Sequence, residues 1–469
     1  MASFGGILSI ARGALSTSQA AVAIASHNIA NASTPGYSRQ REVLIEGPPE
    51  NTTLGIFGTG VRLVTVQRAR DLLLDQEYRM SSGQAGSSSM RSEFLQRVEG
   101  VFAEPSATGL SSALDKFYNA WSDLASDPTN ASARTAVQQA GAALARTFNT
   151  AAGQLDTLKA EVAQRAQATV DSVNGIAREV AELNARIVSM EGGGHTASDL
   201  RDQRDVLLDT LSKEASTRVI ERTDGGTQVL LGTISLVDGI SAKQVQLINS
   251  GTLGFKIVGS ADTMRSIGGE LGALQQVYNS DIADTSTSLD TLASSIITDV
   301  NALHNTGWSP TAGVSGNWNP MTPPTGSMVD FFDASAGNDT AGRIRLSTTV
   351  DANAGAIAAG TGLNEAGNNL LALSVAGLRD NAPSAVNVNY AADFRTIVGS
   401  IAGHLNEAKN STSVYNSLVD QSQQRRTAVF GVSVDEELIQ IMRQQQAYAA
   451  ASKVIKTVDE MMQTLLSLK

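Results

Sequence analysis

At the start of the chain, apolar and small residues alternate at spacings of four and three. Such a heptad pattern predicts a helix that packs in the manner of a coiled coil. Large side chains form one seam of this helix and small side chains form the other. The two seams together comprise Phe4, Leu8, Ala11, Leu15, Ser18, Val22, Ala25 and Ile29. We expect the helix to end at Thr34-Pro35-Gly36-Tyr37, because this proline and glycine favour a turn.

A second heptad helix is predicted at the other end of the chain. Ser433 and Glu436 form a capping box at its start, in which the serine accepts from the third helical amide. Its apolar residues form two seams. The first seam comprises Val434, Leu438, Ile441, Tyr448, Ile455, Met462 and Leu466. The second comprises Val454, Val458, Met461, Leu465 and Leu468. Two seams require two neighbours, so we expect other helices to enclose this one.

Helical periodicity also dominates the interior of the chain. Apolar residues recur at helical spacing over 144–190, 271–303 and 394–419. At 1.5 Å per residue the first of these segments makes a helix about 70 Å long. The sequence therefore predicts a rod, with the interior stripes forming its intramolecular bundle.

Two regions depart from the helical pattern. Between about 219 and 258 the period changes to two, with short β-type runs separated by glycine turns, which predicts a small inserted β domain. A strand is also expected at 61–66. The region 307–388 is rich in Gly, Pro and Asn, and we expect loops and a few strands there.

These elements predict a mainly α fold with an inserted small β domain. The molecule is expected to be an elongated multi-domain rod whose N- and C-terminal coiled-coil-like helices are brought together. A chain of 469 residues exceeds what one core usually holds. We assign 1–60 with 430–469 to a terminal helical assembly domain and 61–212 with 270–306 and 389–429 to a helical-bundle rod domain. The remainder, 213–269 with 307–388, is assigned to an outer domain of strands and loops.

Composition excludes several classes of function. The net charge is −11 and no Lys/Arg cluster interleaves with aromatic residues, so we expect no nucleic-acid or membrane partner. The chain has no cysteine and only four histidines, none in a His-Glu-x-x-His pair. We therefore predict no catalytic residues, no metal site and no cofactor, and hence no enzyme. The histidines are His27, His195, His304 and His404.

Three aspartates at helical spacing are the remaining candidates for chemistry. Asp199, Asp202 and Asp205 recur every three residues with Arg201 and Arg204 between them. We interpret them as a charged helix face and not as a calcium loop, because the loop glycine is missing.

No targeting or membrane segment is predicted. The N-terminus lacks a basic region before an apolar core, so a cleaved secretory signal is not expected. The most apolar stretch, Ala20 to Ala25, is far shorter than the roughly 20 residues that cross a bilayer.

The ends of the chain resemble a known family. Residues Ser26 to Gln40 are similar to the N-terminal signature of flagellar rod, hook and hook-associated proteins, and Tyr37-Ser38-Arg39-Gln40 resembles the hook-associated protein 1 family in particular. At the C-terminus, 431–437, 443–448 and 457–461 resemble the end of that family. The stretches 200–205, 268–274 and 330–332 fit in order. The resemblance covers the chain except for about 310–385, where this sequence is shorter than many members.

The resemblance implies a structural axial protein of the bacterial flagellum. Copies would form a homo-oligomeric ring at the junction between the hook protein and hook-associated protein 3. A cytoplasmic export chaperone would hold the C-terminal region, and the chain would leave through the flagellar export apparatus without a cleaved signal peptide. Terminal segments would order when neighbours cover their apolar seams. The expected assembly interface comprises Phe4, Leu8, Leu15, Val22, Ile29, Leu438, Ile441, Tyr448, Ile455, Met462 and Leu466.

Two alternatives remain open from the sequence. Another axial component, such as a hook or rod protein, would share the terminal helices. A secreted adhesin or enzyme displayed on such helices would instead use 307–388 as its active part.

Overall fold

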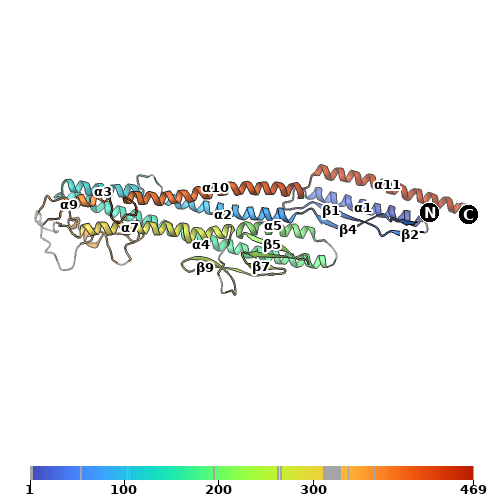
Figure 1. Ribbon diagram of the computed structural model, residues 1–469, viewed down its shortest axis with the longest axis horizontal. Coiled ribbons are helices and arrows are strands. Elements are labelled where there is room, and N and C mark those ends of the chain that lie inside the picture. Colours follow the sequence, from blue (N-terminus) through green and yellow to red (C-terminus); the bar gives the residue numbers. More distant parts are fainter. Residues whose placement is uncertain are drawn as a thin grey trace.

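The computed structural model is a long rod whose helices run back and forth along its length (Figure 1). It describes residues 4–52, 55–102, 104, 106–193, 196–260, 263–264, 267–309, 329–335, 337–362 and 365–467. His195 and Leu468 lie outside the described residues. The mainly α fold with an inserted small β region is confirmed.

The two ends of the chain lie side by side at one end of the rod (Figure 1). Helix α1 (Phe4–Asn31) packs against α11 (Val434–Ser467). Strand β1 (Gln40–Glu46) pairs antiparallel with β4 (Val61–Arg68), and α1 also packs on this hairpin. The hairpin carries β2 (Glu50–Thr52) and β3 (Gly55–Phe57) between its two long strands. We call α1, α11 and β1 to β4 together the terminal unit.

Long helices form the rest of the rod. The longest, α4, has 62 residues and is therefore about 93 Å long. It starts earlier than its apolar stripe predicted, because Asn130 caps it by accepting from the amides of Ser132 and Ala133 at 2.9 and 3.2 Å. Its predicted stripe from Leu144 to Met190 is buried over most of its length, whereas Ile176 is half-buried and Met190 at its end is 45% exposed. The helices of the rod are α2 (Leu72–Phe102), α3 (Leu110–Ser126), α4 (Ala131–Gly192), α5 (Ser198–Ala215), α6 (Gly269–Gln276), the π-turn η1 (Val277–Asp281), α7 (Ile282–His304) and α10 (Tyr390–Phe430).

The predicted β region lies along one side of the rod, beside α4 and α5 (Figure 1). A four-stranded sheet has the order β5-β6-β7-β8, and β9 pairs with β10 as a separate hairpin. The side-chain amide of Asn184 on α4 anchors the sheet by donating to the carbonyl groups of Thr227 and Gly239 at 3.1 and 2.7 Å. The strands are β5 (Thr217–Glu221), β6 (Thr227–Leu231), β7 (Ile234–Asp238), β8 (Ser241–Ala242), β9 (Val245–Asn249) and β10 (Leu253–Ile257).

The described part of 307–388 closes the opposite end of the rod. It contains α8 (Thr348–Ala352), the 3-10 turn η2 (Ala354–Ala356) and α9 (Leu370–Gly377), and its strand pairing is limited to isolated bridges. The expected strands do not form in these described residues. Phe331 and Phe332 are fully buried against the rod, in ring contact with Phe117 of α3.

The two segments assigned to one outer domain lie apart in space. Strands β5 to β10 flank the middle of the rod, whereas α9 lies at its end (Figure 1). The division into domains stays a prediction, and this placement favours two separate outer regions over one.

Helix α1 has one property that the sequence analysis did not expect. Within the described residues it is the one helix, over Gly5–Asn31, that is long and apolar enough to span a membrane by length and composition alone. This property was not predicted because only the uninterrupted apolar run from Ala20 to Ala25 was considered as a membrane span. The same composition suits a helix that packs closely on others through small side chains, so the absence of a membrane partner stays a prediction.

Candidate assembly interface

The apolar residues that α1 buries are small, whereas α11 buries the larger Val458 as well as Ala451. Ala11, Ala21 and Ala25 of α1 are almost fully buried, as is Ala451 of α11. Small side chains let two backbones approach closely, and they leave the larger side chains on other faces of the helices. This arrangement matches the two seams predicted for α1.

The predicted interface residues all lie on this helix pair, and none of those with a described side chain is buried. Leu8 is 37% exposed, Leu438 47% and Leu466 72%, and Tyr448 and Met462 are exposed as well. The half-buried members are Leu15, Val22, Ile29, Ile441 and Ile455. Phe4 begins α1, and its side chain is outside the described part. Among the described residues, α1 is the helix that packs extensively on α11, so the second neighbour predicted for α11 stays a prediction.

Further apolar residues of the terminal unit are exposed besides the predicted interface set. On the helices they include Ile10, Ile439, Met442, Val454, Met461 and Leu465. On the hairpin they are Leu44, Ile45, Ile56, Phe57, Val61, Leu63 and Val64. The hairpin residues were missed, although the alternation at 61–66 that predicted a strand also signals an apolar face in need of cover. Apolar surface of this extent marks an interaction site.

A buried ionic network joins the terminal unit to the rod. The guanidinium group of Arg68, at the end of β4, donates to carboxylate oxygens of Asp202 and Asp205 on α5, both at 2.7 Å. Arg70 lies 3.3 Å and Arg79 3.1 Å from Asp205. Burial raises the pKa of Asp205, but the charges of Arg70, Arg68 and Arg79 outweigh it and hold that pKa well below its usual range.

Further pairs extend this network across the rod. Arg426 of α10 contacts Asp75 of α2 at 2.7 Å and Asp209 of α5 at 2.9 Å. Arg70 and Arg79 reach the same two carboxylates, at 3.0 and 2.7 Å respectively. The network therefore ties together β4, α2, α5 and α10.

The interpretation of 199–205 as a charged helix face is wrong for most of its residues. Asp202 and Asp205 are 6% exposed and Arg204 is fully buried. Burial is possible because arginines from distant parts of the chain neutralise the aspartates. Arg204 donates to Asn184 and to the carbonyl of Gly225 at 2.9 and 2.8 Å, and burial lowers its pKa to about 10.

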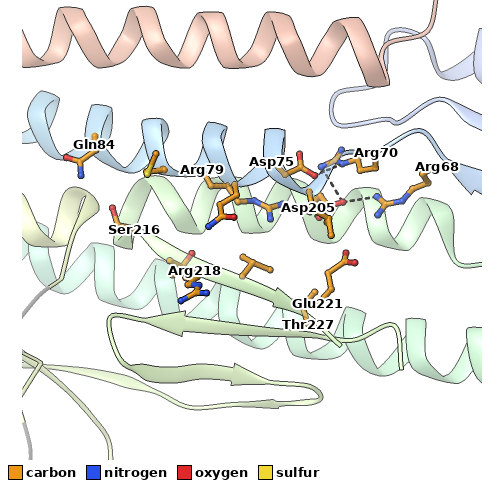
Figure 2. Close-up of a pocket in the computed structure, with 15 residues that line it drawn as sticks. Arg68, Arg70, Asp75, Arg79, Gln84, Asp205, Ser216, Arg218, Glu221 and Thr227 are labelled. Carbon is orange, nitrogen blue, oxygen red and sulfur yellow. Dashed lines mark hydrogen bonds and ion pairs between the residues drawn. The ribbon is translucent and has the colours of Figure 1, made fainter. Parts of the chain in front are cut away.

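Figure 2 shows a cavity of about 400 Å³ beside this network, between α2, α5 and β5. Its walls include Arg79 and Asp205 on one side and Arg218 and Glu221 on the other. In the part of the chain that the structure describes, no group of acidic or histidine side chains is arranged to hold a metal ion. The network connects the terminal unit to the rod.

Three segments of the chain match models of known protein families. Residues 95–317 match the family model described as the flagellar hook-associated protein FlgK helical domain. Residues 8–37 match the flagella basal body rod protein model, and 423–468 match the flagellar basal body rod FlgEFG protein C-terminal model.

Full-length relatives agree with these models. Flagellar hook-associated protein 1 of Bacillus subtilis is 27% identical, over 98% of this chain and 97% of its own length. The protein of the same name from Salmonella typhimurium is 25% identical, over 99% of this chain and 100% of its own. A solved structure, the flagellar hook junction protein FlgK from Burkholderia pseudomallei, is similar with a TM-score of 0.63 at 17% identity. It covers 76% of this chain and 100% of its own, and it shows that the fold is shared.

Proposed function

Because this chain belongs to the flagellar hook-associated protein 1 family, we propose that it forms the junction ring between hook and filament, assembling through its terminal unit. The family is structural, so the chain is an axial component of the flagellum outside the cell and not an enzyme. The observation that carries the proposal is the apolar surface of the terminal unit, which stays uncovered when α1 and α11 pack together.

The surface of α11 supports the self-assembly part of the proposal. The helix has two apolar seams, and among the described residues α1 is the helix that packs extensively on it. Burial of apolar area contributes about 25 cal/mol per Å². Neighbouring copies that cover Leu438, Met462 and Leu466 would therefore be held together mainly by the hydrophobic effect. Residues 1–60 with 430–469 act in this proposal as the assembly domain, and the remaining regions as the rod and its outer parts.

The identity of the neighbours rests on the terminal segments. Both match models of basal body rod proteins rather than models confined to one component. Axial proteins that share terminal helices would present similar seams, so this chain would pack beside hook protein on one side and hook-associated protein 3 on the other. Before assembly, a cytoplasmic export chaperone would cover the exposed C-terminal seams. The chain would leave unfolded through the flagellar export apparatus. Because it has no cysteine, no disulfide would have to be broken for it to pass in an unfolded state.

Exposed interface residues provide the test. Leu438→Glu and Leu466→Glu place a charge on the proposed interface, at positions 47% and 72% exposed. We expect each variant to fail to restore motility in a strain that lacks this protein, with unpolymerised flagellin appearing in the medium. Thermal unfolding of the purified variants should match that of the parent. The matched control is Ile240→Glu, because Ile240 is 69% exposed on the β region, and it should restore motility.

The outcomes separate the candidate functions. Normal motility with both interface variants would refute the assignment of the interface. A strain that fails to build its hook or rod when this protein is absent would instead support the alternative axial components.

A further inference from the structure

The segment Tyr37 to Gln40 links α1 to β1 and contacts three parts of the molecule: α1, the break between α10 and α11, and the rod. Its first set of contacts is to α1. The hydroxyl of Tyr37 and the amide of Gln40 both donate to Oδ1 of Asn28, at 2.7 and 2.9 Å. In return, Nδ2 of Asn28 donates to the carbonyl of Gln40 at 2.9 Å and to Glu437 of α11 at 3.1 Å. Asn28 is 1% exposed, so water does not replace these partners.

Its second set of contacts is to the break between α10 and α11. The guanidinium group of Arg39 lies 2.6 Å from Glu437 and 2.9 Å from Glu436. The backbone amide of Arg39 donates to the carbonyl of Phe430, the last residue of α10, at 2.9 Å. Glu436 is therefore drawn to Arg39 rather than back to Ser433, although Ser433 still accepts from the Glu436 amide at 3.4 Å.

Its third set of contacts is to the rod. The backbone amide and the hydroxyl of Ser38 both donate to Asp202 of α5, at 3.0 and 2.7 Å. Ser38 is fully buried. The side chain of Gln40 donates to Asp199 at 3.0 Å. Asp202 also pairs with Arg68, so this segment and the end of the hairpin share one carboxylate.

No helix runs across the boundary between the terminal unit and the rod. The chain crosses it at 69–71, between β4 and α2, and at 431–433, between α10 and α11. Both crossings are short non-helical links, which leave the angle between the two bodies free unless side chains fix it. We propose that Tyr37–Gln40 is the joint that fixes the orientation of the terminal unit on the rod, with Ser38 and Asp202 as its orienting pair.

Orientation matters for assembly because apolar seams of neighbouring copies meet only if each copy holds its terminal unit at the same angle. That use of the joint rests on the proposed function. The joint itself is a property of the single chain and is measured without assembly.

The absence of cysteine makes the measurement direct. Spin labels are attached at Lys456→Cys on α11 and Arg186→Cys on α4, both exposed, in the full chain. Pulsed electron spin resonance then gives the distribution of distances between the terminal unit and the rod. We expect one narrow distribution in the parent and at least a twofold broader or shifted one in Ser38→Ala and Asp202→Asn. Asp238→Asn, which disturbs an exposed pair with Arg222 on the β region, should leave the distribution unchanged.

A second label pair guards against simple unfolding. Labels at Arg186→Cys and Gln424→Cys both lie on the rod, on α4 and α10. The distribution of distances within the rod should stay narrow in Ser38→Ala. If Asp202→Asn broadens it, that variant has disturbed the rod itself, and the proposal is then judged from Ser38→Ala. Unchanged distances between terminal unit and rod in Ser38→Ala would overturn the joint, as would a broad distribution in the parent. Either result leaves the motility test of Leu438→Glu unaffected, so failure of the joint and failure of the assembly interface are distinguishable.

Discussion

Neutralising one carboxylate tests whether the buried ionic network holds the rod together. Asp205 pairs with Arg68, Arg70 and Arg79 at 2.7, 3.3 and 3.1 Å, and its side chain is 9% exposed. Asp205→Asn keeps the shape of the side chain but removes its charge. Breaking a buried pair costs about 3–5 kcal/mol, because it leaves an uncompensated buried charge. Each of the three arginines retains a second carboxylate, so we expect the lower end, about 3 kcal/mol.

The assay is urea unfolding at pH 7, followed by circular dichroism, with the free energy of unfolding taken from the midpoint. The control is Asp238→Asn, whose side chain is 55% exposed in its pair with Arg222 and which should cost less than about 1 kcal/mol. Arg70→Met combined with Asp205→Asn restores the charge balance, so the double variant should be more stable than the sum of the two single losses predicts. If Asp205→Asn costs no more than the control, the network contributes nothing and the reasoning fails.

Three further predictions concern other parts of the chain. Burial lowers the pKa of His304 to about 4. As the pH falls, this imidazole is protonated in the unfolded chain before it is protonated in the folded chain, so the free energy of unfolding should fall by about 2 kcal/mol between pH 7 and pH 5. Urea titrations at both pH values should show that His304→Asn removes this loss. Gly36 has a φ of +79°, and a β-carbon there would lie 2.2 Å from Cγ2 of Val206. Gly36→Ala should therefore lower the free energy of unfolding by about 1–3 kcal/mol. Adding Val206→Ala should recover only the part of this loss that is due to the clash, as measured by thermal unfolding. Leu158 is 7% exposed in α4, so Leu158→Glu should unfold the rod and abolish its cooperative melting, and a normal melting curve would show that this stripe is not core.

The long elements of the fold were predictable because their periodicity extends over many turns. The stripe of α4, the alternation at 219–258 and the seams of α1 each repeat often enough to identify the type of structure. The start of α4 was not predictable from its stripe, since 131–143 begins at a cap on Asn130 and contains one apolar side chain larger than alanine, Val137.

The ionic network was beyond the reach of spacing arguments. The pattern of Asp202 and Asp205 is the same whether the helix face meets water or meets arginines. Their partner Arg68 lies 134 residues from Asp202 in the sequence, and only the packing of the hairpin on α5 brings them together. The same holds for Ser38, whose hydroxyl has no distinguishing sequence signal apart from its place in a family motif.

The position of the two chain ends has a practical consequence for labelling. Helices near both ends of the chain lie together in the terminal unit (Figure 1), so a fluorescent protein or affinity tag fused at either end would lie close to the proposed assembly surface. Helix α9 lies at the opposite end of the rod (Figure 1), and α4, which runs along the rod, is about 93 Å long. A fusion placed beside α9 would therefore lie far from the proposed assembly surface.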